Sequence, residues 1–168
     1  QEYGFRVTGA ALMGDLNGQR VSSERVRQAV RLGHMATAED LLGRPWQTRH
    51  EVIRGDQRGR AWGFPTANMM LNEYIHPAYG IYAARITVEG QDASHKAVMS
   101  FGKRPHYPLQ QPLLEAHLLD FECDLYGKVL RVQWCDYLRP EKRFASEDLL
   151  RKAIAEDVQR ARELLSSP

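Results

Sequence analysis

Residues 59–68 of this 168-residue chain read Gly59-Arg60-Ala61-Trp62-Gly63-Phe64-Pro65-Thr66-Ala67-Asn68. Glycine allows backbone conformations that a Cβ forbids and lets the main chain approach a ligand closely. Pro65 fixes its own φ and disfavours helix at Phe64, so the segment is predicted to be an extended or turning loop. Thr66 and Asn68 offer neutral oxygens, which Mg²⁺ accepts beside phosphate oxygens. Two interpretations follow: a phosphate-and-metal loop, or a plain Gly/Pro turn between two strands.

Strand patterns lie on both sides of this loop. Runs rich in β-branched and aromatic residues, or apolar at alternate positions, predict strands over 47–54, 79–88, 95–101, 113–121 and 128–138, with weaker strand character at 3–12. In 113–121, one face is expected to hold Leu114, Ala116 and Leu118 and the other Glu115, His117 and Leu119. In 128–138, a single row is expected to hold Leu130, Val132, Trp134 and Leu138.

Helices are predicted at both ends of this β-rich region. A short helix starts within 21–24 and ends at Gly33, and a second runs from Thr37, as N-cap, to Gly43. A long helix opens at Ser146, and its buried stripe is predicted to be Leu150, Ile154, Val158, Ala161 and Leu165. Consecutive strands followed by one helix indicate a mostly β fold, an antiparallel barrel or rolled sheet capped by that helix.

Composition limits the classes of function. The formal net charge is +2, and basic residues are interspersed with acidic ones, so no nucleic-acid partner is expected. Cys123 and Cys135 form no CxxC pair, so neither a disulfide framework nor a zinc site is predicted. No apolar run approaches the roughly 20 residues of a membrane span, and no signal peptide is visible. We expect a soluble, cytoplasmic protein with a single core and no membrane partner.

Three stretches could carry chemistry. Glu115 lies in the middle of an apolar strand, where it is either a general base for a hydroxyl or a charge on a solvent-facing surface. Residues 100–108 combine glycine, prolines and two cations, as a phosphate contact or a basic surface loop would. Arg139 could donate a bidentate pair to a carboxylate, a phosphate or a flat polar ring, or lie in a plain connector to the last helix. GxxxxGK[ST] is absent, which excludes a P-loop kinase.

Taken in order, these motifs resemble the riboflavin kinase family over about residues 46–165. The resemblance rests on 55–68, with its Pro-Thr-Ala-Asn signature, on 79–83 (Tyr-Gly-Ile-Tyr-Ala), on 101–105 (Phe-Gly-Lys-Arg-Pro), on 114–121 with 124–127, and on 138–144. The spacing to the last helix, including Asp157, also fits. His106 stands where bacterial members more often have Thr.

The resemblance implies a six-stranded antiparallel barrel with a C-terminal helix. It also implies transfer of the ATP γ-phosphoryl group to the ribityl 5′-hydroxyl of riboflavin, which gives FMN and ADP. By the same resemblance, Thr66 and Asn68 hold Mg²⁺ or another divalent metal, and Glu115 takes the hydroxyl proton. The flavin is expected at Arg139 and Phe144, and ATP at Gly55, Gly59, Arg60, Gly63, Pro65, Thr66 and Asn68.

Residues 21–45 resemble the tail of the FMN adenylyltransferase domain of bifunctional bacterial FAD synthetases. In that tail a Ser-Ser-x-x-x-Arg segment, here Ser22, Ser23 and Arg27, helps to bind nucleotide. The nucleotide-binding α/β fold that precedes such a tail is absent, and Glu24 replaces a usual Thr. We therefore expect 1–45 to be a helical linker and 46–168 a riboflavin kinase domain. We also expect FMN without FAD from this chain alone, and an N-terminal adenylyltransferase domain in a parent protein.

Two other classes remain as alternatives. The first is a non-catalytic module that binds flavin or nucleotide on the same barrel, which Glu115→Gln separates from a kinase by turnover. The second is a nucleic-acid-binding barrel, which requires exposed aromatic residues on a basic face.

Overall fold

The computed structural model describes residues 14–15, 18–55, 59, 62–103 and 111–166. The strand expected at 3–12 lies outside these residues. The strands are β1 (Gln47–Glu51), β2 (Ala67–Met70), β3 (Gly80–Val88), β4 (Ser94–Lys103), β5 (Pro112–Leu118) and β6 (Val129–Arg139). The helices are α1 (Ser23–Arg31), α2 (Met35–Leu42) and α4 (Glu147–Leu164).

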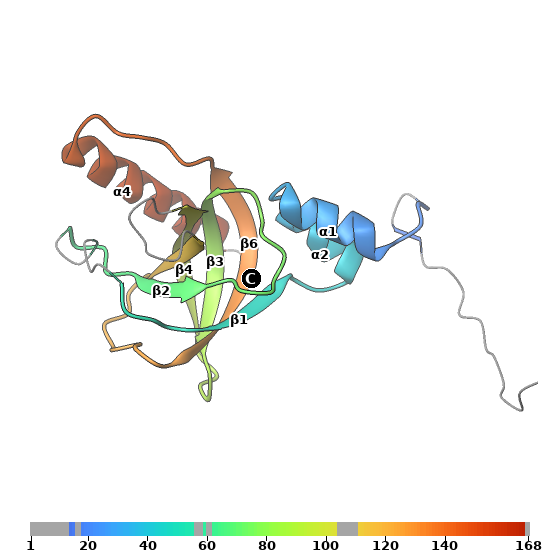
Figure 1. Cartoon of the computed structure of the whole chain (residues 1–168), viewed down its shortest axis with the longest axis horizontal. Coiled ribbons are helices and arrows are strands. Elements are labelled where there is room, and N and C mark those ends of the chain that lie inside the picture. Colours follow the sequence, from blue (N-terminus) through green and yellow to red (C-terminus); the bar gives the residue numbers. More distant parts are fainter. Residues whose placement is uncertain (1–13, 16–17, 56–58, 60–61, 104–110, 167–168) are drawn as a thin grey trace, which may run out of the picture.

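All six strands belong to one antiparallel sheet in the order β1-β6-β3-β4-β5-β2. The two edge strands approach each other where the Ile53 N–H donates to the Asn68 carbonyl over 2.8 Å, which brings the sheet close to a closed barrel. Figure 1 shows this curved sheet, with α4 on one side and the α1–α2 pair beside β6. The predicted fold class is confirmed. The sequence pattern missed β2, because four residues are too few to show alternation.

The inside of the barrel holds the main hydrophobic core, to which alternate residues of β2, β3, β4, β5 and β6 contribute. In β5 these are Leu114, Ala116 and Leu118, as predicted, and Glu115 and His117 therefore face outward. Two polar residues of β1, Thr48 and His50, also lie in the interior. The Thr48 hydroxyl accepts the indole N–H of Trp134 over 2.9 Å. Among the described residues, His50 Nε2 has no hydrogen-bond partner.

The single row predicted for 128–138 is wrong at its end. Ala84 pairs with Trp134 but Ala83 pairs with Asp136, so a bulge inserts one residue into β6 and reverses the alternation beyond it. Leu138 consequently lies outside the barrel, in a second hydrophobic cluster under α4. Its neighbour Tyr137 packs against Tyr82 with ring centroids 5.1 Å apart.

The first helix begins and ends as predicted, whereas the second begins earlier. Ser22 caps α1 by accepting the Arg25 N–H, and Gly33 follows with a φ of 76°. The predicted N-cap at Thr37 is wrong, because α2 already starts at Met35, after His34, and ends at Gly43. Tertiary packing accounts for the extra turn, since the Met35 side chain is buried in the main core. The helix pair thus packs into the same core as the barrel.

The last helix covers the outside of the sheet. Ser146 caps it, as predicted, by accepting the Leu149 N–H. Within the predicted stripe, Ala161 and Leu165 are buried, whereas Leu150, Ile154 and Val158 are half-buried. Asp157 is the other buried residue of α4.

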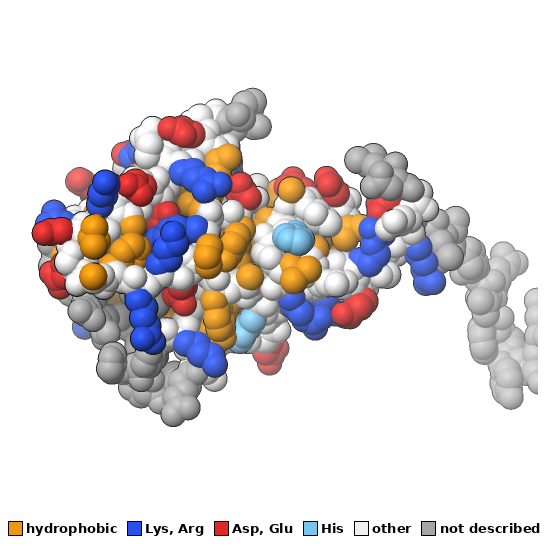
Figure 2. All heavy atoms as spheres, turned by 90° about the horizontal axis from the view of Figure 1, so that it is seen from above, with side chains coloured by type: hydrophobic (Ala, Val, Ile, Leu, Met, Phe, Trp, Pro, Cys, Tyr) orange, Lys and Arg blue, Asp and Glu red, His pale blue; other side chains and the backbone are white. Residues whose placement is uncertain are grey.

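The surface is mixed in charge on the face drawn in Figure 2, where basic and acidic side chains lie among apolar ones. Across the part of the chain that the structure describes, no helix is both long and apolar enough to cross a membrane.

Candidate active site

One row of paired residues crosses five neighbouring strands on the outer face of the barrel. Glu115 of β5 lies opposite Asn68 of β2 on one side and opposite Ser100 of β4 on the other. Ser100 pairs in turn with Ile81 of β3, and Ile81 with Arg139 of β6. Paired residues of antiparallel strands project to the same face. The register therefore brings together Asn68 and Glu115, which were predicted separately, and adds Ser100, the first residue of the stretch 100–108 that the sequence singled out.

Glu115 itself is half-buried, next to Asn68 at one end of this row. Its neighbours across the strands are an amide and a hydroxyl, neither of which carries a charge. At strand spacings of about 4.8 Å, Arg139 lies about 14 Å from Glu115, three strands along the row.

Two of the predicted glycines, Gly55 and Gly59, fit closely against the start of β2. A Cβ at Gly55 would overlap the amide group of Asn68, and one at Gly59 would overlap the carbonyl oxygen of Phe64. Gly63 has a φ of 81°, in the left-handed region that favours glycine. Asn68 is thereby enclosed, with 4% of its surface exposed. Arg60 lies outside the described residues.

Pro65 and Thr66 connect this loop to the rest of the barrel. The Pro65 carbonyl lies 2.8 Å from Nδ1 of His117 on β5, and the Phe64 ring meets the His117 ring edge-on at 5.5 Å. These contacts hold the loop against the strand that carries Glu115. His117 thus has a defined role in placing the loop.

A cavity of about 520 Å³ opens beside Thr66, within the size range of small-molecule sites. Its wall combines loop and strand residues with the β5–β6 connection: Val52, Pro65, Thr66, Ala67, Ala116, Leu118, Phe121, Glu122, Cys123, Asp124, Leu125 and Tyr126. The sequence marked 124–127 only through the family motif, and it gave no signal for Glu122 or Cys123.

Arg139 ends β6 and is held by an intramolecular ion pair. Its Nε and Nη2 donate to the two carboxylate oxygens of Asp157 on α4 over 2.9 and 2.6 Å, and its Nη1 donates to the Pro140 carbonyl over 3.0 Å. The Phe144 ring centroid lies 5.8 Å from the guanidinium carbon. The two residues predicted to contact flavin are therefore adjacent, and sequence spacing alone did not reveal the Asp157 partner.

The segment after β6 is also joined to β4. The Glu141 carboxylate lies against Gly102, close enough that a Cβ at this position would displace it. The predicted basic loop at 100–108 is described only to Lys103, and its remaining residues up to Pro108 lie outside the described part of the chain.

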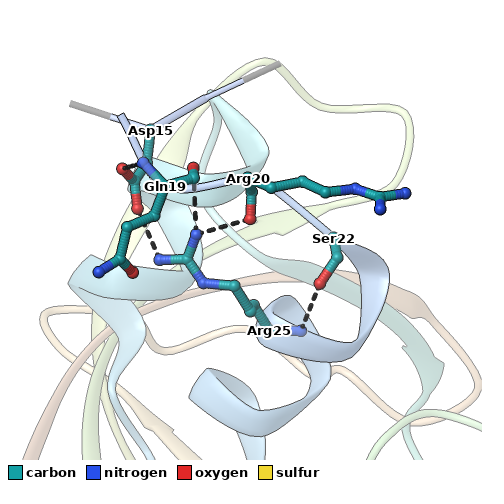
Figure 3. A network of polar contacts seen from close by, with 5 residues as sticks. All are labelled: Asp15, Gln19, Arg20, Ser22 and Arg25. Carbon is teal, nitrogen blue, oxygen red and sulfur yellow. Dashed lines mark hydrogen bonds and ion pairs between the residues drawn. The ribbon is translucent and has the colours of Figure 1, made fainter. Parts of the chain in front are cut away.

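Two residues of the N-terminal serine motif, Ser22 and Arg27, make contacts with residues close to them in the chain. Ser22 Oγ accepts the Arg25 N–H over 3.3 Å as the cap of α1, and Arg27 lies 3.5 Å from Glu24. In Figure 3 the Arg25 guanidinium reaches Asp15 and the Gln19 and Arg20 carbonyls, over 2.5, 3.3 and 2.8 Å. This network fixes the turn that precedes α1.

Among the described residues, no group of three His, Cys, Asp or Glu side chains could hold a metal ion. Thr66 and Asn68 nevertheless fit a hard cation, because two neutral oxygens two residues apart share one side of an extended segment. Such a pair suits a metal whose remaining ligands are phosphate oxygens.

Known proteins match this barrel and its motifs. The family model described as Flavokinase, riboflavin kinase, matches residues 42–165. The bifunctional riboflavin kinase/FMN adenylyltransferase of Escherichia coli (strain K12) is 41% identical over 162 residues, covering 96% of this chain and 51% of the relative. The chain thus spans about half the length of the curated relatives it matches.

Two solved structures share the fold. One is the crystal structure of a macrolide-efflux protein from Streptococcus pneumoniae, with a TM-score of 0.80 and 34% identity, covering 90% of this chain and 49% of that one. The other is riboflavin kinase from Trypanosoma brucei, with a TM-score of 0.53 and 26% identity, covering 74% and 82%. The chain belongs to the riboflavin kinase family. The predicted resemblance is confirmed.

Proposed function

We propose that this chain phosphorylates riboflavin at its ribityl 5′-hydroxyl with ATP, giving FMN and ADP. The observation that carries the proposal is the pairing of Glu115 with Asn68 on the outer face, two residues from Thr66, which lines a cavity of about 520 Å³. A carboxylate that can accept a proton thus lies next to neutral oxygens suited to a metal–phosphate group. Phosphoryl transfer requires this kind of positioning and charge neutralisation more than it requires covalent chemistry by the protein.

The nucleotide is assigned to the cavity. Thr66 borders it, and the preceding loop is rich in glycine, whose backbone N–H groups can approach phosphates closely. Thr66 and Asn68 would hold Mg²⁺ or another divalent metal, which neutralises charge on the phosphates when it is bound. Gly55 and Gly59 keep this loop close to β2, because larger residues would displace Asn68 and Phe64.

The flavin is assigned to the two ends of the stretch from Glu115 to Arg139, with its ribityl end at Glu115 and its ring at Arg139. It would pass beside α4, because Ile81, which lies between Glu115 and Arg139, is buried under that helix. Their separation of about 14 Å along the row is comparable to the reach of a flavin ring with an extended ribityl chain. With the ring near Arg139 and Phe144, the chain would lead to the carboxylate of Glu115. Glu115 takes the proton of the 5′-hydroxyl as that oxygen bonds to the γ-phosphorus, and the bond to ADP breaks.

Incubation with riboflavin, ATP and Mg²⁺, followed by separation of the flavins, tests the proposal. The expected product is FMN in an amount equal to the ADP released, without FAD. Omitting the divalent metal should abolish FMN formation, and Asn68→Ala should raise the Mg²⁺ concentration required for half-maximal rate. Flavin binding with no FMN under any divalent metal would favour the non-catalytic module instead.

The finer assignments follow from the same proposal. A reaction that consumes ATP is expected in the cytoplasm. Residues 46–168 would form the kinase unit and 1–45 the segment that joins it to an adenylyltransferase domain in a parent protein. Deleting residues 1–45 tests that boundary. Because Met35 and Trp46 share one core, we expect the shortened chain to lose stability while keeping the candidate site residues.

A further inference from the structure

Two carboxylate–guanidinium pairs attach α4 to the barrel, and they differ in burial. Arg162 of α4 donates to both carboxylate oxygens of Asp120 over 2.6 and 2.7 Å, in a pair whose side chains are 41% and 73% exposed. The pair between Arg139 and Asp157 has similar geometry, but its side chains are only 18% and 8% exposed. Solvent screens the first pair strongly and the second one weakly.

Burial makes the second pair a poor means of simply attaching a helix. Removing two charges from water is unfavourable, and apolar residues of similar volume often hold such a position as well or better. A bidentate pair does fix the plane and direction of a guanidinium, which apolar packing cannot do. The distinctive effect of Asp157 is therefore the orientation of Arg139.

The orientation leaves part of the guanidinium available. Nε, Nη1 and Nη2 each donate one hydrogen bond within the chain, so one N–H on each terminal nitrogen has no partner among the described residues. Phe144 lies against the group at 5.8 Å. Arg139 thus presents two fixed donors and an adjacent aromatic ring, a combination that suits a flat ring with carbonyl oxygens.

We propose that Asp157 is a positioning residue that orients Arg139 for the flavin ring. This inference rests on the proposed function for the identity of the ligand. Its consequence is specific. Loss of Asp157 should weaken flavin binding, while the ATP site and Glu115, toward the other end of the row, should stay in place.

The test compares Asp157→Asn with Asp120→Asn, which removes the exposed pair from the same helix. Asparagine tolerates the left-handed backbone of Asp120, whose φ is 57°. Dissociation constants of riboflavin and FMN are measured by flavin fluorescence quenching, beside kcat and the KM values of both substrates. Asp157→Asn should raise the riboflavin dissociation constant and KM roughly tenfold, as expected for weakening one charge-assisted contact. The KM of ATP should change less than twofold, and Asp120→Asn should leave all these values unchanged.

Asp157→Glu guards against a folding defect, because it keeps the charge while moving the carboxylate by one methylene. It should give an intermediate rise in the riboflavin dissociation constant at an unchanged circular-dichroism spectrum. Unchanged riboflavin binding in both Asp157 variants overturns the proposal, and so does an equal rise in both KM values. A wild-type chain that binds flavin but makes no FMN defeats the kinase assignment alone, since the binding constants still decide the role of Asp157. A wild-type chain that binds no flavin defeats the role of Asp157.

Discussion

Thr48 and His50 point into the barrel, whereas Asn68 and Glu115 lie on its outer face, and the two pairs use polarity differently. The inner pair is surrounded by core side chains and has a structural role. For example, the Trp134 indole N–H donates a hydrogen bond to the Thr48 hydroxyl. The outer pair lies beside the glycine loop, which suits phosphate. The row of paired residues that it begins ends at Arg139, near α4. We infer that inner polar groups set stability and outer ones set chemistry, so substitutions on the two faces should separate these properties.

The largest expected effect is on the outer face, from Glu115→Gln. Loss of the proton acceptor should lower kcat about 10²- to 10⁴-fold, the usual contribution of general-base catalysis. The riboflavin dissociation constant should stay within about twofold of the wild-type value, because glutamine keeps the shape of the side chain. Steady-state kinetics and fluorescence titration measure the two quantities. Glu51→Gln, an exposed strand carboxylate on β1, is the control and should change neither.

On the inner face, His50 should make stability depend on acid. Burial lowers the pKa of His50 to about 4 from its ordinary 6.5, against a weaker opposing effect of a hydrogen bond with the Met70 backbone. The unfolded chain therefore binds a proton at higher pH than the folded one. Stability from this group is complete above pH 6.5 and is lost as pH falls through 6.5 toward 4.

The loss amounts to about 3 kcal/mol across that window, since the pKa falls from 6.5 to about 4. Urea unfolding at several pH values measures it as the difference between wild type and His50→Leu. The variant should lack this part of the acid sensitivity. His34→Gln, at an exposed histidine, should behave as wild type. Parallel pH curves for wild type and His50→Leu would remove His50 from the account.

A smaller effect is expected at the glycine loop. In Gly55→Ala the new Cβ would overlap the Asn68 amide, so that side chain must move from its place beside Glu115. We expect the KM of ATP and the Mg²⁺ requirement to rise roughly tenfold, about 1.4 kcal/mol, with riboflavin binding retained. Gly14→Ala is the matched control, because a Cβ there would first meet the Gly18 backbone at 3.4 Å. An unchanged ATP KM would show that the placement of Asn68 is unimportant.

The smallest effect should come from Thr48→Val on the inner face. The substitution keeps the side-chain volume but leaves the buried Trp134 N–H without its acceptor, at a cost of about 1 kcal/mol. Tryptophan fluorescence during urea unfolding reports the change. Turnover per folded molecule should equal that of wild type. A loss of turnover here would contradict the division of roles between the two faces.

Local chemistry was enough to predict several elements from the sequence. The helix starts near Ser22 and at Ser146 were predicted because a serine hydroxyl accepts a hydrogen bond from a free N–H group of the first turn. This interaction does not depend on distant residues. The strands from 79 to 138 were predicted within a few residues because alternation is also local. The motif at 55–68, taken in order with those at 79–83, 101–105, 114–127 and 138–144, identified the family, since each motif is a local run of residues.

Other features depended on residues far away in the chain. The early start of α2 follows from burial of Met35 in the barrel core, and the outward position of Leu138 follows from a bulge that no local pattern predicted. Local helix and strand propensities are weak in isolation, and tertiary packing overrides them.

For the candidate site, the sequence by itself determined which residue types were present: a glycine loop, Thr66, Asn68, Glu115 and Arg139. The tertiary structure alone decided that Asn68 faces Glu115 and that Asp157 holds Arg139. The physical reason is that strand register and helix docking are set by the total burial of the core. A one-residue shift of β5 would have moved Glu115 to the opposite face without changing any local motif.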